Sequence, residues 1–221
     1  MQPAETPGTP PLISLRNFVV LRDETPLFVP VSFDLHARQS LQIKAVNGGG
    51  KTTLLRCLYG LAIDYQGEVL LYGKPAATTA LRHQAAYMND RAGVYGHLTT
   101  EENLDYMLLL HAIRLERNQR EETLARVGLL ASRRLLARRL SKGQKKRLHL
   151  ARLRLLDKPM WLLDEPFDGL DTQGRELLRD MLAAHIAAGG AVVFSSHLDA
   201  HASYQSHLLL ELLGLEHPEK S

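Results

Sequence analysis

The sequence predicts an α/β fold with three parts: a core of alternating strands and helices, an antiparallel β layer, and an inserted α-helical subdomain. Three observations carry this prediction. A strand, a glycine loop and a helix follow one another without a gap over residues 40–61. Bare apolar runs at residues 161–163 and 191–194 are typical of central parallel strands covered on both faces. Residues 99–156 show apolar residues at helical spacing.

The individual elements are predicted from composition and spacing. Short β-branched or aromatic stretches bounded by turn residues predict strands. They lie at residues 13–21, 31–35, 40–46, 67–72 and 85–88. The first two predict the antiparallel layer. Leucines at helical spacing after Thr53 predict the helix behind the glycine loop. Thr99 and Glu102 have the spacing of a capping box, which predicts the start of the helical region.

Length and composition place the chain among folded proteins of one domain. It has 221 residues, of which 45% are hydrophobic and 23% charged, and this excludes disordered and collagen-like classes. We expect a loose leader over residues 1–11, a folded domain over residues 12–200 with its helical subdomain at about 90–156, and an extension over residues 201–221.

A single cysteine, Cys57, excludes an intramolecular disulfide and fits a reducing compartment. No apolar run reaches the roughly 20 residues that span a bilayer, so any membrane connection is expected through a partner protein.

Charge is distributed unevenly along the chain. The formal net charge is +3, but residues 114–154 hold 14 Lys and Arg against three Glu, a local charge of +11. The rest of the chain carries −8. Taken alone, this asymmetry suggests nucleic acid or an acidic membrane surface as a partner.

The glycine loop is close to the phosphate-loop pattern G-x-x-x-x-G-K-[ST]. Its residues are Ala45, Val46, Asn47, Gly48, Gly49, Gly50, Lys51, Thr52 and Thr53. Such a loop turns backbone N–H groups toward phosphate oxygens, and the helix N-terminus behind it favours an anion. Lys51 would reach the β- and γ-phosphates, and the Thr52 hydroxyl would contact Mg²⁺. Alanine replaces the first glycine of the pattern at Ala45.

Two carboxylates, Asp164 and Glu165, follow the apolar run at residues 161–163. Ligands of open α/β sheets bind at the carboxyl ends of strands. We therefore expect Asp164 to hold Mg²⁺, and Glu165 to act as the catalytic residue that orients or polarises the attacking water. An acidic turn without function would be the ordinary interpretation if the phosphate loop were absent.

A third motif, Leu140-Ser141-Lys142-Gly143-Gln144, precedes a basic helix. Together with the first two motifs it resembles the signature of ATP-binding-cassette (ABC) ATPases, which are P-loop NTPases with a RecA-like core. Lysine replaces a glycine of that signature at Lys142. The resemblance covers about residues 12–200. It implies a head-to-tail homodimer in which Ser141, Gly143 and Gln144 of one copy close over the ATP bound by the other.

Two further segments agree with this resemblance. Residues 168–171 (DGLD) match the D-loop that couples the two sites, and His197 matches the switch histidine that contacts the γ-phosphate. Two positions depart. The family's Mg²⁺-sensing glutamine falls on Arg91, with Asp90 as a substitute ligand. The adenine-stacking aromatic falls near Arg22, which could stack on the base or simply line a cavity.

Within the family, residues 22–33, 153–167 and 183–193 resemble the haem-exporter ATPase of cytochrome c maturation, whereas residues 89–95 depart from it. This resemblance implies ATP and Mg²⁺ as cofactors and integral-membrane partners of the CcmB/CcmC kind. It also implies haem as cargo and a peripheral location on the cytoplasmic face of a bacterial inner membrane.

Three alternatives remain at this point. The chain could serve another exporter, or it could act on nucleic acid or the ribosome, as the basic segment suggests. It could also be a non-hydrolysing regulatory subunit, as Ala45, Lys142 and Arg91 suggest. Retention of the expected nucleotide, metal and catalytic residues argues against the last alternative: these are Lys51, Thr52, Asp164, Glu165 and His197.

Overall fold

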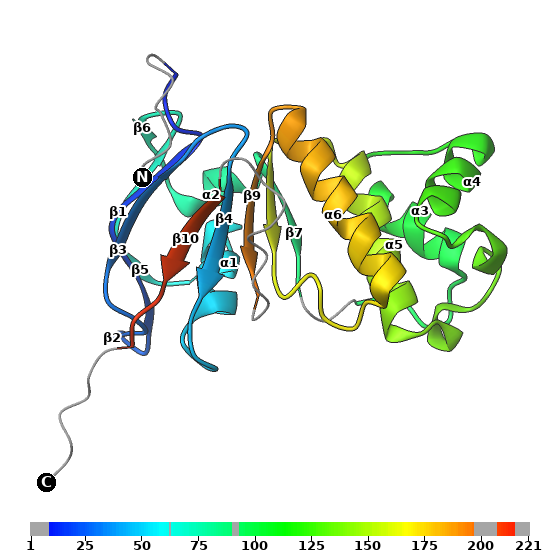
Figure 1. The fold of residues 1–221 in the computed structure, drawn as a ribbon, viewed down its shortest axis with the longest axis horizontal. Helices are drawn as coiled ribbons and strands as arrows, with labels where there is room; N and C mark the ends of the chain where they lie inside the picture. The colour runs from blue at the N-terminus through cyan, green and yellow to red at the C-terminus, as the bar shows by residue number, and fades with distance from the viewer. Residues whose placement is uncertain (1–8, 62, 90–92, 197–206, 215–221) are drawn as a thin grey trace, which may run out of the picture.

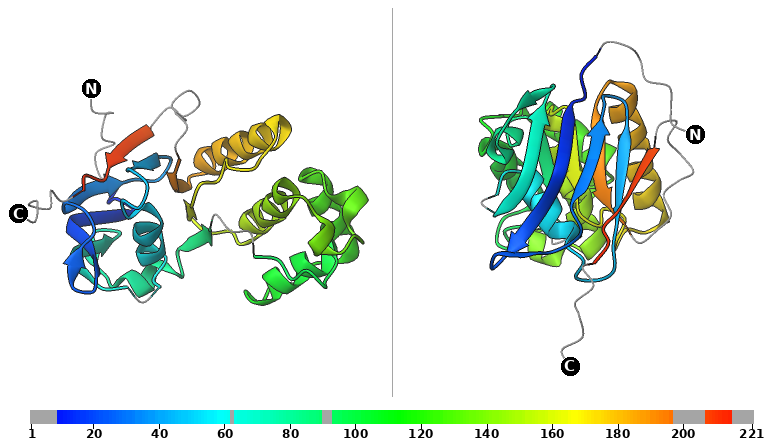
Figure 2. Two further views of the ribbon diagram at one scale, coloured as in Figure 1. Left: turned by 90° about the horizontal axis from the view of Figure 1, so that it is seen from below. Right: turned by 90° about the vertical axis from the view of Figure 1, so that its left-hand side faces the viewer.

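The computed structural model describes residues 9–61, 63–89, 93–196 and 207–214. Two sheets and a set of helices make up this part of the chain, and they form two lobes joined at the parallel sheet (Figures 1 and 2). The left lobe of Figure 1 carries both sheets and α1, and the right lobe carries most of the helices. The predicted α/β class with an antiparallel layer and a helical insertion is confirmed.

The central sheet is parallel and has the strand order β10-β4-β9-β8-β7. Its strands are β4 (Ser40–Lys44), β7 (Ala85–Met88), β8 (Met160–Leu163), β9 (Ala191–Ser195) and β10 (His207–Glu211). Because every pair is parallel, the carboxyl ends of β4, β9 and β8 lie at one edge of the sheet. That edge carries both predicted chemical motifs.

The second sheet is antiparallel and covers one face of the first (Figure 1). Its strands are β1 (Ile13–Arg22), β2 (Thr25–Pro26), β3 (Val31–Leu35), β5 (Tyr65–Leu71) and β6 (Lys74–Pro75). The long strand β1 pairs with β2, β3 and β5, and β6 pairs with β5.

The helices divide between the two faces of the parallel sheet. On the side of the antiparallel layer lie α1 (Lys51–Leu58) and α2 (Thr78–Leu81). The other lobe contains α3 (Thr100–Leu109), α4 (Arg117–Arg126), two short 3-10 turns (Leu130–Ser132 and Ala137–Arg139), α5 (Lys142–Leu155) and α6 (Thr172–Ala187).

Two hydrophobic cores lie on opposite sides of the parallel sheet, and successive side chains of its strands point into one core and then the other. In β8, Met160 and Leu162 point into the core around α1, whereas Trp161 and Leu163 point into the core around α5 and α6. Successive side chains of a strand face opposite sides, so a strand buried on both faces is apolar at every position. This explains why the sequence of β8 is a continuous apolar run.

One strand of the sheet comes from the segment that the sequence suggested as an extension. Strand β10 pairs in parallel with β4 at the edge of the sheet, from His207 opposite Ser40 to Glu211 opposite Lys44. Two backbone bonds continue this attachment, Leu212 N–H to Lys44 O at 2.8 Å and Val29 N–H to Leu213 O at 3.0 Å. Within the described ranges, none of the helices combines the length and apolar character needed to cross a bilayer.

Candidate active site

The glycine loop connects the carboxyl end of β4 to the first turn of α1. Gly48 and Gly50 have φ angles of 80° and 92°, a left-handed conformation that glycine adopts without strain. Gly50 also lies against a buried ring, because a Cβ at this position would come 2.8 Å from Phe28 Cδ1. The loop therefore needs glycine at position 50 for two independent reasons. Val46 and Asn47 at its tip are exposed.

Gly50 is the N-cap of α1, and no side chain caps this end of the helix. The first N–H groups of a helix have no partner within the helix, so here they can accept an anion as ligand. The Lys51 ammonium lies over the loop and donates to Ala45 O at 2.9 Å and Val46 O at 3.4 Å. Thr52 and Thr53 follow in the first turn and are half-buried. The loop, its lysine and the helix end have the arrangement that phosphate binding needs, and we call them the phosphate cradle.

The two carboxylates lie where β8 ends, next to the end of β9. Asp164 is only 3% exposed, and its Oδ1 accepts a hydrogen bond of 2.8 Å from Ser195 Oγ. The same hydroxyl oxygen accepts the N–H of Glu165 at 2.9 Å. Ser195 thus fixes the side chain of Asp164 and the backbone of Glu165 together. Its role has no signal in the sequence beyond its place at the end of an apolar run.

Topology brings the cradle and the carboxylates to one place. Strand β9 lies between β4 and β8 and pairs with both. A buried side chain links the strand ends directly, since Gln42 Nε2 of β4 donates to Ser196 O at 3.2 Å. The predicted nucleotide-binding and catalytic residues from Ala45 to Thr53 and at positions 164 and 165 therefore share one edge of the sheet. His197, Asp90 and Arg91 lie outside the described residues.

The signature residues occupy the N-terminal end of α5. Ser141 is the N-cap, and it forms a capping box with Gln144: Ser141 Oγ accepts the N–H of Gln144 at 3.1 Å, and Gln144 Oε1 accepts the N–H of Ser141 at 2.9 Å. A Cβ on Gly143 would lie 2.9 Å from Gly169 O, so the helix closely approaches residues 168–171.

Helices α5 and α1 pack into different cores on opposite faces of the sheet (Figure 1). Ser141, Gly143 and Gln144 thus belong to a helix that packs on the face of the sheet opposite to α1.

Arg22, at the end of β1, lines a hollow beside the phosphate cradle. The hollow has a volume of about 570 Å³, and its lining includes Arg22, Asp23, Thr53, Ile63 and Tyr65. Thr53 belongs to the first turn of α1, so the hollow adjoins the helix end that would hold the phosphates. The structure thus places Arg22 beside a space next to the cradle, and stacking on a base remains a prediction.

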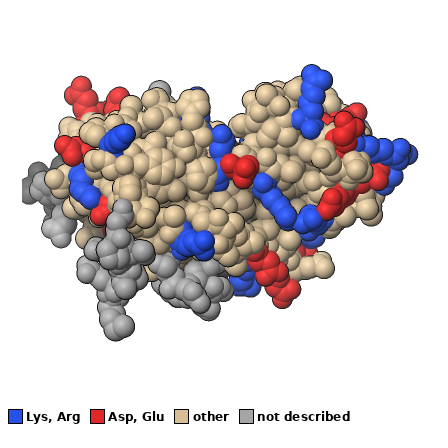
Figure 3. All heavy atoms as spheres, turned by 90° about the horizontal axis from the view of Figure 1, so that it is seen from above, with Lys and Arg blue, Asp and Glu red and all other residues tan. Residues whose placement is uncertain are grey.

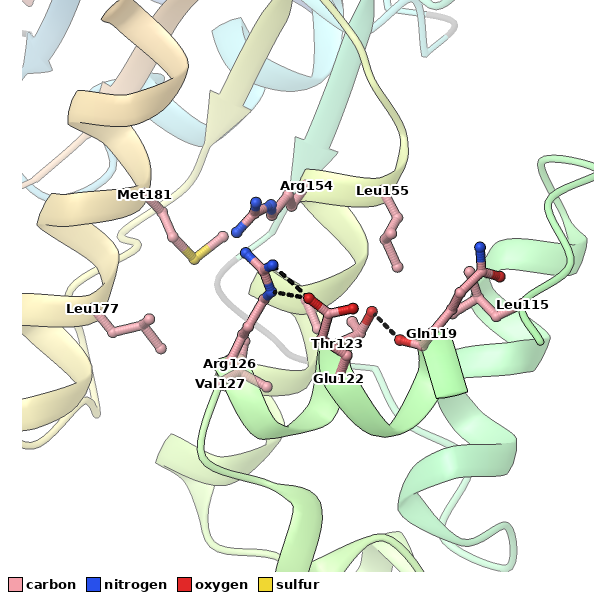
Figure 4. Close-up of a pocket in the computed structure, with 11 residues that line it drawn as sticks. Leu115, Gln119, Glu122, Thr123, Arg126, Val127, Arg154, Leu155, Leu177 and Met181 are labelled. Atoms are coloured by element: carbon pink, nitrogen blue, oxygen red, sulfur yellow. Dashed lines mark hydrogen bonds and ion pairs between the residues drawn. The ribbon is translucent and has the colours of Figure 1, made fainter. Parts of the chain in front are cut away.

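A different hollow, of about 260 Å³, lies between α4, α5 and α6 (Figure 4). Leu155, Leu177 and Met181 supply apolar lining, and Arg126 is bound to Glu122 at 2.5 Å on the α4 side. None of the residues predicted for phosphate, metal or catalysis lines it. It is therefore separate from the site at the sheet edge.

A family model described as "ABC transporter" matches residues 28–168 of the chain, more than half of its length. Among curated relatives, the chain is 42% identical over 188 residues to the "Cytochrome c biogenesis ATP-binding export protein CcmA" of Xanthomonas campestris pv. campestris strain 8004, covering 85% of this chain and 87% of that protein. It is 37% identical to the Vibrio cholerae protein of the same description, covering 86% and 93%.

Solved structures with the same fold include one described as "Structure of ATP binding subunit of ABC transporter". It aligns with a TM-score of 0.77 over 91% of this chain and 88% of that chain, at 23% identity. A putative ABC transporter ATP-binding protein from Pyrococcus furiosus aligns with a TM-score of 0.76 at 22% identity, covering 90% and 96%. At these identities the structures bear on the fold alone.

Proposed function

The chain belongs to the ABC transporter family, as an ATPase subunit most like the CcmA export proteins of cytochrome c biogenesis, and we propose that it hydrolyses ATP at the shared edge of β4, β9 and β8. The proposal rests on one observation, which is that the phosphate cradle and the two carboxylates lie at the same edge of the parallel sheet. A phosphate cradle follows β4, and two carboxylates fixed by Ser195 follow β8, one strand away.

Each residue of the cradle has a defined task in this proposal. The backbone N–H groups of the loop and of the first turn of α1 bind the phosphate oxygens. Lys51, whose ammonium already lies over the loop at Ala45 O, binds the β- and γ-phosphates. Thr53 contributes a further hydroxyl beside the hollow that Arg22 lines, and the base of the nucleotide enters this hollow.

The donor set at the edge fits Mg²⁺. Thr52 offers a hydroxyl and Asp164 a nearly buried carboxylate, and oxygen is the donor that Mg²⁺ prefers. Over the described ranges, no group of three or more His, Cys, Asp and Glu side chains could hold a metal. This agrees with an ion that proteins bind through one or two side chains together with substrate phosphates and water. Bound Mg²⁺ would neutralise charge that develops on the phosphates.

Glu165 orients the water that attacks the γ-phosphorus and accepts its proton. His197, which follows the end of β9 in the sequence, contacts the γ-phosphate. In this proposal a second copy completes each site, because Ser141, Gly143 and Gln144 begin a helix that packs on the opposite face of the sheet from α1 of their own chain. The exposed N-terminus of α5 of that copy would contact the nucleotide through its hydroxyl and helix end.

The cargo and partners follow from the resemblance to the CcmA proteins. We propose that a homodimer docks on CcmB/CcmC-like integral-membrane subunits at the cytoplasmic face of a bacterial inner membrane and drives export of haem. Copurification of the chain with such subunits, and stimulation of its ATPase activity by them, would support this assignment. Export function without any such association would contradict it.

Replacement of Glu165 tests the chemical step. We expect Glu165→Gln to lower ATP turnover about 100-fold or more while ATP binding persists, so that ATP-bound dimer accumulates. Steady-state hydrolysis and size-exclusion chromatography with ATP and Mg²⁺ measure the two effects. Glu176→Gln, on the exposed side of α6, is the matched control and should keep wild-type turnover. Unchanged turnover in Glu165→Gln would remove this residue from the mechanism.

A further inference from the structure

Lys146 of α5 is a buried lysine whose ammonium is bonded to the turn that follows β8. Only 1% of the residue is exposed, and Nζ donates to Glu165 O at 2.5 Å and to Asp168 O at 2.8 Å. Burial of an ammonium is costly unless hydrogen bonds replace its hydration. Two backbone carbonyls beside the proposed catalytic carboxylate thus supply hydrogen bonds to the buried ammonium of Lys146.

The backbone of Glu165 has an unusual conformation that its surroundings must maintain. Its φ is 44°, a left-handed value that is uncommon for residues other than glycine. Such conformations persist where neighbouring groups over-determine them, often at functional sites. Here Ser195 Oγ holds the N–H of Glu165 from β9, and Lys146 Nζ holds its carbonyl from α5. The direction of the Glu165 side chain thus depends on both anchors.

The same end of α5 contacts this turn at two more places. Arg147 pairs with Asp171 at 3.0 Å, and the side chain of Lys142 lies over Gly169, where a Cβ would come 2.8 Å from Lys142 Cδ. Three side chains of α5 thus lie against residues 165–171, two of them through hydrogen bonds or an ion pair. Of these three, Lys146 is the one whose bonds reach the peptide of Glu165.

We infer that Lys146 is a positioning residue for Glu165, and that it couples the signature end of α5 to the catalytic carboxylate of the same chain. The inference rests on the proposed function. In a head-to-tail dimer, Ser141 of one copy contacts the nucleotide of the other copy, while Lys146 of that first copy holds the carboxylate acting on its own nucleotide. A shift of α5 on nucleotide binding at one site would thus reach Glu165 at the other.

Substitutions at position 146 test this coupling. We expect Lys146→Met, which keeps an unbranched apolar side chain but removes the ammonium and its donors, to lower kcat about tenfold or more and to leave ATP affinity within about twofold. Lys146→Arg should recover most of the loss, because a guanidinium can donate to the same carbonyls. Lys145→Met, one residue earlier on α5 and half-exposed, is the matched control and should keep wild-type kcat.

A second background separates positioning from general loss of structure. If Lys146 acts through Glu165, Lys146→Met should lower the residual rate of Glu165→Gln by less than about twofold. If it acts only through the fold, the two losses should multiply, and this outcome would overturn the inference. Lys146→Gln, which keeps an uncharged amide as donor group, replaces Lys146→Met if the latter does not fold, and its kcat should also fall with affinity retained.

The two proposals fail in different ways. Wild-type kcat in Lys146→Met or Lys146→Gln overturns the positioning role and leaves the ATPase assignment intact. Absence of Mg²⁺-dependent hydrolysis by the wild-type dimer overturns both.

Discussion

Ala45 and Gly49 face each other across the phosphate loop. A Cβ on Gly49 would lie 2.9 Å from the Cβ of Ala45 and 3.0 Å from Val46 O, closer than side chains ordinarily pack. The methyl group that Ala45 brings to the first position of the pattern therefore occupies the space that a side chain at position 49 would need. The departure at Ala45 is accommodated by glycine four residues later.

This pairing predicts a compensated double substitution. Gly49→Ala should distort the loop and weaken ATP binding, at an overpacking cost of about 1–3 kcal/mol. Ala45→Gly combined with Gly49→Ala removes the methyl–methyl contact and should recover a substantial part of the affinity. Titration of ATP binding in a double-mutant cycle gives the coupling between the two positions.

Ala45→Gly alone is the control for this cycle. It adds no atom to the loop, so its affinity for ATP should stay near that of the wild type. The pairing would be refuted by a Gly49→Ala protein that binds ATP normally, or by a double variant that binds no better than Gly49→Ala.

His149 of α5 predicts a specific dependence of stability on pH. The residue is 7% exposed, and its Nε2 lies 3.2 Å from Gly93 O. Burial first, and then the positive charge of Arg152, lower the pKa of His149 to about 4 from the usual 6.5, against a smaller opposing effect of the Gly93 carbonyl. Lys146 adds a weaker repulsion. At a pH between about 4 and 6.5, His149 therefore binds a proton in the unfolded chain but not in the folded chain.

The free energy of unfolding should therefore fall as the pH is lowered from 6.5 and level off below about 4, by on the order of 3 kcal/mol from this residue. Urea unfolding of His149→Gln at several pH values measures the effect, because this variant should lack that part of the wild-type decrease. His83→Gln, at an exposed position, should retain it. An identical pH profile in wild type and His149→Gln would contradict the prediction.

Candidate site residues that are neighbours in the sequence could be proposed from it, whereas contacts that cross the fold could not. The loop from Ala45 to Thr52 and the pair after β8 follow from local patterns with a known physical purpose. Ser195 and Lys146 act on that pair through bonds that cross 31 and 19 residues of chain. Such bonds exist only once the sheet and α5 are packed, and a single sequence does not record them.

Among the elements, the starts of two helices could be predicted from capping residues that are close together in the sequence. The capping box predicted at Thr99 and Glu102 is present, with Thr99 Oγ1 accepting the N–H of Glu102 and Glu102 Oε2 accepting the N–H of Thr99 at 2.7 Å. A cap is formed by residues three apart, so its signal survives in the sequence. The same reasoning applies to the box of Ser141 and Gln144 at the start of α5.

Strand β10 shows the opposite case. Its residues 208–210 are three leucines, a short apolar run that fits either a strand or part of a helix. Its strand identity comes from pairing with β4, more than 160 residues earlier in the chain. A partner at that separation leaves no periodic signal in either segment, because register in a parallel pair is decided by tertiary packing. The sequence therefore placed this segment outside the folded domain.

At the scale of the whole molecule, several basic side chains of the helical lobe bond to groups of the same chain. Arg120 pairs with Asp105 at 2.8 Å, and Arg147 pairs with Asp171. Arg152 donates to Tyr87 O at 2.5 Å, and burial lowers the pKa of its guanidinium. On the face seen in Figure 3, acidic and basic side chains are interspersed over this lobe. The local charge of +11 therefore does not form a continuous basic surface on this face, which weakens the alternative that the chain acts on nucleic acid.

The proposed assembly has a consequence that only mixed dimers reveal. If each site combines the cradle of one copy with Ser141 of the other, then Lys51→Ala and Ser141→Arg should each abolish hydrolysis in a homodimer. A mixture of the two variants should regain activity, because a mixed dimer holds one complete site with an intact lysine and an intact serine. Random pairing at equal amounts gives at most about a quarter of the wild-type rate.

Two controls show whether the regained ATPase activity belongs to mixed dimers that hold one complete site. Tagging one variant and isolating the mixed dimer with ATP establishes that it forms. Mixing Lys51→Ala with Lys51→Ala/Ser141→Arg is the control, because no dimer in that mixture contains an intact lysine, and it should stay inactive. Isolated mixed dimers that bind ATP but remain as inactive as this control would argue that Ser141 does not complete the site of the other copy. Because α5 and α1 pack on opposite faces of the sheet in one chain, we propose that Ser141 serves the other copy, and we expect the mixed dimer to regain ATPase activity.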